Sequence, residues 1–172
     1  MNAALRFSLF RCREEKPQPL CVTGCPRSGT TLLYCMLRYT VRNYEFHDNE
    51  TPEPSDGVIT KAPHAVFALR DGVRAIVMIR DPREVLTSIH GKYKNAGYFV
   101  SAHSCVNSSH KGLCEWWTAI KALPDACLIR YERLIEDPRG AQAELGERFG
   151  LEYYAGRHFD EFHEMPHAPT WE

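Results

Sequence analysis

The sequence predicts an α/β protein, a three-layer sandwich in which a central parallel sheet carries helices on both faces. Short apolar runs of strand length alternate along the chain with segments whose apolar residues recur at helical spacing. The clearest of these runs, RAIVMIR at 74–80, is typical of a strand that a parallel sheet buries on both faces. The chain has 172 residues, enough for one core, so a single domain over 1–172 is expected.

The strongest local signals lie at the first strand and at two helix ends. LCVTG at 20–24 is a short apolar run that ends at a glycine, and a helix at 30–42 follows it. The helix expected at 81–94 starts with Asp then Pro, an N-cap followed by proline at the first helical position. The helix expected at 137–150 ends at a glycine. The other expected elements are strands at 43–47, 58–61 and 125–132, helices at 63–70 and 111–123, and loops at 48–57 and 95–109.

Composition excludes several classes of protein. A formal net charge of -1 argues against a general nucleic-acid binder, although it leaves room for a small basic pocket. The apolar stretch near the N-terminus is broken by Arg6 and is too short for a membrane span. The seven cysteines are odd in number and lack module spacing, which is typical of a reduced chain. We therefore expect a cytoplasmic protein with no membrane span and no nucleic-acid partner, and the sequence leaves a homo-oligomer open.

CVTGCPRSGTTLL at 21–33 resembles a phosphate-binding loop that lacks its lysine. Gly24 and Gly29 have the spacing of a P-loop, but Thr30 stands where the lysine belongs. Glycines at those positions let the backbone approach a ligand, and the amides of the next helix hold an anion. Arg27 supplies a cation from within the loop. The pattern predicts a P-loop NTPase-like arrangement that binds an anion without the usual lysine.

RDPREVLTS at 80–88 offers a second anion site. Arg80 ends the central strand, and Ser88 follows about two helical turns later. For both to meet one phosphate, the helix must run back beside the ligand. Taken alone, an Arg-Asp-Pro helix start fits a simple helix cap equally well.

PRSGTTLL, RDPREVLTS and LIRYERLIEDPRGAQAELGERFGL occur in that order, and together they resemble the sulfotransferase superfamily over roughly residues 18–152. These enzymes use 3′-phosphoadenosine 5′-phosphosulfate (PAPS) and release 3′,5′-bisphosphoadenosine (PAP). The resemblance implies transfer of a sulfuryl group from PAPS to a hydroxyl or amine of a small-molecule, carbohydrate or protein-tyrosine acceptor. Because no γ-phosphate or Mg²⁺ has to be held, it also explains the missing lysine.

The resemblance also assigns roles to individual residues. It places Arg80 and Ser88 at the 3′-phosphate, and it matches Tyr131 to a family tyrosine near the nucleotide. A core aromatic at a strand end accounts for Tyr131 equally well. The residues implied to contact the 5′-phosphosulfate are Arg27, Ser28, Gly29, Thr30 and Thr31.

The reaction centre needs a cation for the leaving phosphate and a base for the acceptor proton. Lys61, in KAP, resembles the Lys-x-Pro of tyrosine-modifying and several bacterial sulfotransferases, although a solvated lysine at a strand end has the same pattern. Arg27 is the second cation expected there. Glu50, in a segment similar to one in protein-tyrosine sulfotransferases, is the first choice of base. His64 is the rival, and His47 is the third option.

Three other interpretations fit parts of the sequence. The set His103, Cys105, His110 and Cys114 has the side chains of a zinc site but the spacing of no common module, so no metal is expected. A non-catalytic protein that binds PAP or PAPS would keep both phosphate sites. A P-loop kinase or NTPase would bind ATP with Mg²⁺, and the absent lysine argues against it.

Overall fold

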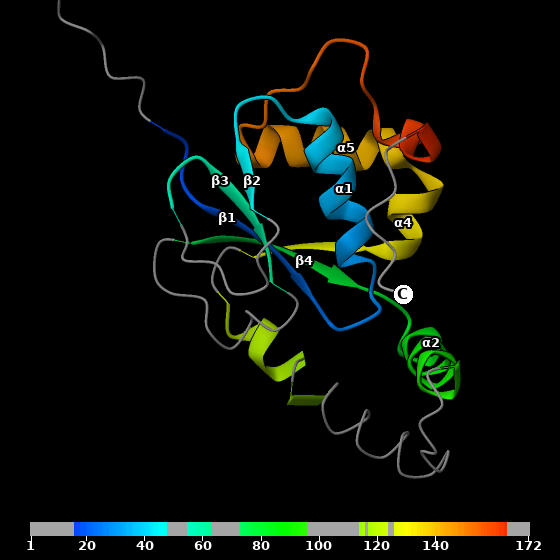
Figure 1. Ribbon diagram of the computed structural model, residues 1–172. Coiled ribbons are helices and arrows are strands. Elements are labelled where there is room, and N and C mark those ends of the chain that lie inside the picture. The colour runs from blue at the N-terminus through cyan, green and yellow to red at the C-terminus, as the bar shows by residue number, and fades with distance from the viewer. Residues whose placement is uncertain are drawn as a thin grey trace, which may run out of the picture.

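A parallel sheet forms the centre of the protein in the computed structural model, which describes residues 16–47, 55–62, 73–95, 114–115, 117–123 and 126–164 (Figure 1). In this part of the chain five strands lie in the order β2-β3-β1-β4-β5, and every neighbouring pair is parallel. The strands are β1 (Leu20–Gly24), β2 (Glu45–His47), β3 (Val58–Lys61), β4 (Arg74–Ile79) and β5 (Cys127–Arg130). The helices are α1 (Thr30–Thr40), α2 (Pro82–Asn95), α4 (Tyr131–Glu136), α5 (Pro138–Phe149) and the 3₁₀ helix η2 (Phe159–Glu164).

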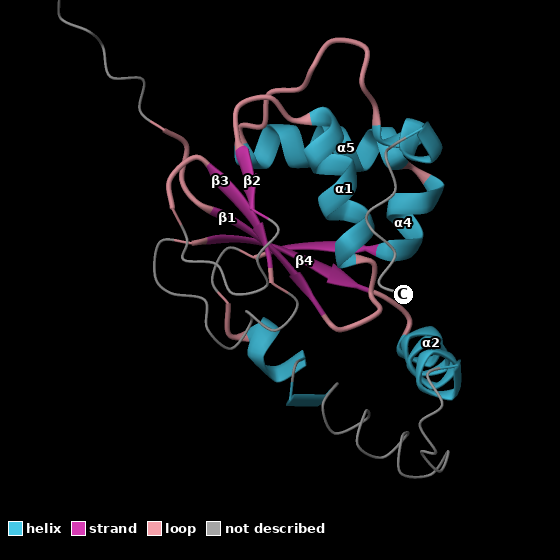
Figure 2. Cartoon of the chain, in the orientation of Figure 1, coloured by secondary structure: helices cyan, strands magenta, loops and turns pink. Residues whose placement is uncertain are grey.

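Helices cover both faces of the sheet, as the alternating pattern predicted (Figure 2). On one face, residues of β1, β3, β4 and β5 form the larger core with α1, α4 and α5. On the other face a smaller core joins Val77 of β4 to Val85 of α2 and to Ile120 in the helical residues 117–121. Both cores are apolar, so burial on the two faces holds the three layers together.

The order of the strands alone indicates where on the sheet a ligand would bind. The chain builds β1, β2 and β3 on one side of the sheet, and then returns to the other side of β1 for β4 and β5. The connections that follow β1 and β4 therefore diverge at the carboxyl ends of two adjacent strands. Open α/β sheets bind ligands at such a switch point. Here the two connections are the segments 25–29 and 80–81.

The sequence located most of these elements closely. β1 and β3 have the bounds that the apolar runs predicted, and Gly150, with a φ of 65°, caps α5 in the left-handed conformation. The strand expected at 125–132 was too long, because Tyr131 begins α4. Arg130, the N-cap of α4, makes no capping hydrogen bond with its side chain, so no cap residue marked the boundary. The helix expected at 63–70 lies outside the described residues.

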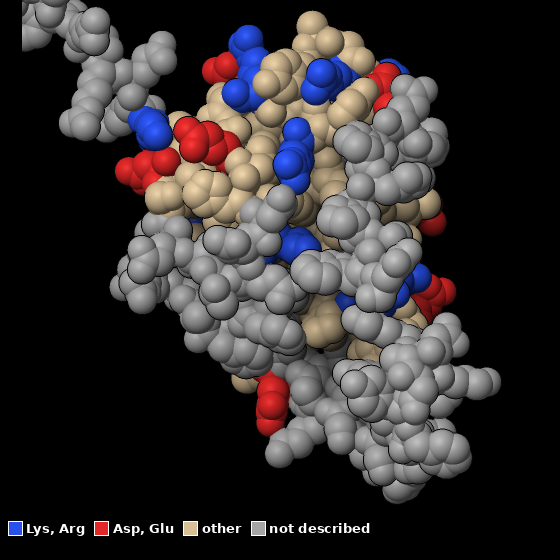
Figure 3. All heavy atoms as spheres, in the orientation of Figure 1, with Lys and Arg blue, Asp and Glu red and all other residues tan. Residues whose placement is uncertain are grey.

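The surface combines both signs of charge. On the face shown in Figure 3, Lys and Arg side chains lie apart from one another, and acidic side chains lie beside several of them. None of the helices in the described ranges has the length and apolar character needed to cross a membrane.

Candidate anion-binding site

The loop between β1 and α1 is a tight turn that needs both of its glycines. The amide of Ser28 donates to the carbonyl of Cys25 at 3.0 Å and closes the turn. Gly29 adopts a φ of 98°, in the left-handed region that favours glycine. A Cβ on Gly24 would lie 2.6 Å from the Ser28 Oγ and 2.9 Å from the carbonyl oxygen of Met78. The glycine spacing read from the sequence therefore reflects close packing of the loop against β4.

The interior of this loop holds polar groups that have no hydrogen-bond partner in the part of the chain that the structure describes. Ser28 is fully buried, and its Oγ has no hydrogen-bond partner among the described residues. A buried hydroxyl left without a partner costs about 1–3 kcal/mol, which a bound oxyanion would recover. Gly29 has no side chain to cap α1, so the first amides of that helix are available to an anion. Thr30 is buried at the first position of the helix, and Thr31 is exposed beside it.

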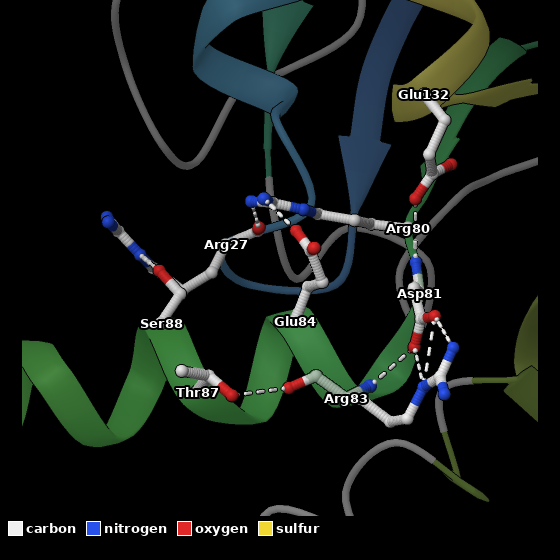
Figure 4. Close-up of polar contacts among 8 residues, drawn as sticks. All are labelled: Arg27, Arg80, Asp81, Arg83, Glu84, Thr87, Ser88 and Glu132. Carbon is white, nitrogen blue, oxygen red and sulfur yellow. Dashed lines mark hydrogen bonds and ion pairs between the residues drawn. The ribbon is translucent and has the colours of Figure 1, made fainter.

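Arg27 connects the loop to α2. Its backbone has a φ of 69°, which is strained for a residue other than glycine. Its Nε donates to the Oγ of Ser88 at 2.9 Å (Figure 4). The helix that starts after β4 therefore lies beside the loop.

Arg80 lies against the loop from the other strand. Its Nη1 donates to the carbonyl oxygen of Arg27 at 3.4 Å, and its guanidinium stacks 4.2 Å from the centre of the Tyr131 ring. The same ring contacts the loop, because a Cβ on Gly29 would lie 2.5 Å from the Tyr131 Cδ2. Tyr131 thus packs against both the loop and Arg80. The sequence alone allows either position for Tyr131, beside the nucleotide or in the core.

Two acidic residues, Glu84 and Glu132, complete this arrangement, and neither is among the site residues expected from the sequence. Glu132 accepts a hydrogen bond from the amide of Asp81 at 3.1 Å and so fixes the start of α2 to α4 (Figure 4). Glu84 pairs with Arg80 at 2.5 Å, four residues away on the first turn of α2. The i,i+4 spacing of opposite charges was visible in the sequence and could have identified Glu84. Nothing local in the sequence indicates the contact of Glu132, which joins residues 51 positions apart.

Asp81 is the N-cap that the sequence predicted. Its Oδ1 accepts from the amide of Arg83 at 2.8 Å, and its carboxylate also pairs with the Arg83 guanidinium. Hydrogen bonds from the Arg83 side chain and then from its amide lower the pKa of Asp81 to about 2. Asp81 is therefore ionised at neutral pH, and its charge is matched by Arg83.

Two cavities open beside Arg80. One, of about 490 Å³, is lined by Arg80, Asp81, Arg83, Glu84, Thr87 and Ser88. The other, of about 610 Å³, extends from Arg80 and Cys25 toward Trp117, on the side of the sheet that α2 covers. Burial raises the pKa of the Cys25 thiol to about 11, so this loop cysteine is a neutral side chain at pH 7.

Of the residues expected at the reaction centre, the structure describes Arg27, Lys61 and His47. Lys61 ends β3 half-buried, and its side chain makes no hydrogen bond or ion pair with the described residues. It is in register with Val22, so it shares the face of the sheet that α1 covers. His47 ends β2 exposed, in register with Thr60, and so lies on the opposite face. Glu50 and His64 lie outside the described residues.

Of the four residues of the zinc alternative, the structure describes Cys114. His103, Cys105 and His110 lie outside the described residues, and Cys114 is exposed. Within the described ranges no group of three or more His, Cys, Asp or Glu side chains could hold a metal ion.

No protein-family model matches the chain, and no curated protein matches it by sequence. Solved structures do match. Retinol dehydratase in complex with androsterone and the inactive cofactor PAP aligns with a TM-score of 0.53 at 15% identity, over 84% of this chain and 63% of that one. Mouse sulfotransferase SULT7A1 complexed with PAP gives 0.55 at 14%, over 77% and 59%. The sulfotransferase domain from the curacin biosynthetic pathway gives 0.54 at 15%, over 82% and 76%.

The chain has the fold of these sulfotransferases. It spans less than two thirds of the length of retinol dehydratase and of the mouse enzyme. Because the identities are near 15%, the likeness concerns the fold.

Proposed function

We propose that this protein is a sulfotransferase that moves a sulfuryl group from PAPS to a hydroxyl or amine acceptor. One observation carries the proposal: the hydrogen bond between Arg27 and Ser88 brings the loop after β1 and the helix after β4 into contact. The two proposed anion sites would therefore adjoin at the switch point of the sheet. A nucleotide with separate 5′ and 3′ phosphate groups needs such a pair. Two solved structures of the same fold contain PAP.

The residues present fit this nucleotide. The buried Oγ of Ser28 and the buried Nε of Arg80 have no hydrogen-bond partner among the described residues, and both can donate to oxyanions. Arg80 and Ser88 would hold the 3′-phosphate. The 5′-phosphosulfate would be held by Arg27, Ser28, Gly29, Thr30 and Thr31. No metal is needed, because the loop amides and the arginines supply the positive field.

PAPS supplies the sulfuryl group when it is bound, and the protein has to position it and balance charge. Sulfuryl transfer resembles phosphoryl transfer, in which positioning and electrostatics do most of the catalysis. Lys61 and Arg27 are the proposed cations near the leaving phosphate. The acceptor proton would pass to Glu50, with His64 and His47 as the alternatives.

Turnover tests the proposal. Transfer of labelled sulfate from PAPS should be measured on hydroxyl and amine acceptors drawn from small molecules, carbohydrates and tyrosine peptides. Androsterone, the ligand of retinol dehydratase, belongs in the panel. Tight binding of PAP with no transfer to any acceptor would favour the non-catalytic alternative.

Arg80→Ala is expected to discriminate between nucleotides that have and lack a 3′-phosphate. Loss of a charge-assisted hydrogen bond costs about 1.5–3 kcal/mol, so affinity for PAP should fall roughly 10- to 150-fold. Affinity for adenosine 5′-phosphosulfate should change little. Calorimetric titration of both nucleotides gives the comparison, and Arg139→Ala, which removes the same charge from α5, is the control. If Arg80→Ala lowers the affinity for both nucleotides equally, Arg80 has a structural role and does not bind the 3′-phosphate.

A further inference from the structure

Arg80 is engaged by a carboxylate of its own chain. Its side chain is 20% exposed, and its Nη2 lies 2.5 Å from the Oε2 of Glu84. Figure 4 shows the Glu84 side chain rising from α2 toward the guanidinium, between the loop and the helix. The carboxylate therefore occupies one of the donor positions that an oxyanion at Arg80 would use.

The other contacts of Arg80 leave its charge uncompensated. The Tyr131 ring offers a π face, the carbonyl oxygen of Arg27 is 3.4 Å away, and the Nε has no hydrogen-bond partner in the described part of the chain. None of these contacts is with an ionised group. The nearby carboxylate of Asp81 is already paired with Arg83. Within the described residues, Glu84 is thus the acidic partner of Arg80.

Glu84 can also leave this position. Its side chain is 60% exposed, and among the described residues that side chain pairs with Arg80. It lies in the first turn of α2, where the helix dipole stabilises a negative charge in either orientation. The features that hold Glu84, a guanidinium and a helix N-terminus, are also those that would hold a phosphate.

We infer that Glu84 is a positioning residue that competes with the 3′-phosphate for Arg80. It holds the guanidinium over Tyr131 when no nucleotide is bound, and it must turn toward solvent when the phosphate arrives. It therefore lowers the affinity for the nucleotide and speeds the release of the product. This inference rests on the proposed function for the identity of the ligand.

Glu84→Gln is the decisive variant, because it keeps the size of the side chain and removes its charge. Breaking an exposed ion pair and removing a like charge beside the phosphate should tighten PAP binding about three- to tenfold. PAP should also dissociate more slowly, and affinity for adenosine 5′-monophosphate, which lacks the 3′-phosphate, should stay unchanged. Glu147→Gln makes the same change in net charge on an exposed position of α5 and should change neither affinity.

The outcomes separate this inference from the proposed function. If the wild-type protein binds PAP and Glu84→Gln binds it equally or more weakly, Glu84 does not compete, and the inference is overturned while the proposed function stands. If the wild-type protein does not bind PAP, the proposed function fails. Inorganic phosphate then becomes the probe: a larger thermal stabilisation of Glu84→Gln than of wild type by phosphate supports the competition, and an equal one overturns it.

Discussion

Lys61→Ala should reduce the single-turnover rate of sulfuryl transfer about 10²- to 10³-fold and leave PAP affinity within about twofold. The reason is that the charge on the leaving phosphate develops mainly in the transition state, so a cation placed there lowers the barrier more than it strengthens binding. Lys61 suits this role because it ends β3 half-buried, and its side chain makes no hydrogen bond or ion pair with the described residues.

The control is Lys121→Ala. Lys121 is exposed and lies 5.4 Å from the Trp117 ring centre, in a different layer of the fold. The Lys121→Ala variant should transfer the sulfuryl group at the wild-type rate. A Lys61→Ala variant that loses affinity and rate by the same factor would show that the lysine binds the ground state and has no special part in the reaction.

Glu50→Gln should keep nucleotide binding and lower turnover by roughly 10²- to 10⁴-fold, the contribution typical of a general base. His64→Ala and His47→Ala should then be mild. Glu50 and His64 lie outside the described residues, so this prediction rests on the resemblance of the segment that contains Glu50. His47 ends β2 on the face of the sheet opposite to Lys61.

Single-turnover rates with saturating PAPS, measured for the three variants beside their PAP affinities, decide among the bases. A silent Glu50→Gln together with an inactive His64→Ala would transfer the role to His64. Turnover that survives in all three variants would mean that the reaction uses no dedicated base among them.

The sequence predicted the layers of the fold because burial on both faces leaves a strong local pattern. The strand at 20–24 is mostly apolar in sequence and buried at every position, and the Asp-Pro starts of α2 and α5 carry their own caps. The change from β5 to α4 at Tyr131 has no capping residue that would indicate it in the sequence. Leu134 in the core favours the helix there, and that contact is tertiary.

Individual residues of the candidate site could be selected from the sequence, but the contacts between them could not. Glycine spacing and the Arg…Ser spacing are local, so Gly24, Gly29, Arg80 and Ser88 could be selected from the sequence alone. The bond from Arg27 to Ser88 joins residues 61 positions apart. It depends on the pairing of β1 with β4, which places the two connections side by side. The sequence pattern of a single segment does not predict the order of the strands in the sheet.

Thermal unfolding with PAP and no Mg²⁺, compared with ATP and Mg²⁺, tests the central claim most directly. A ligand at 100 times its Kd stabilises the folded state by about 2.7 kcal/mol. For a chain of this size that corresponds to a rise in Tm of roughly 5–10 °C. The account predicts this rise for PAP without metal and a much smaller one for ATP with Mg²⁺. An equal or larger rise with ATP and Mg²⁺ would contradict it and indicate an NTPase-like site.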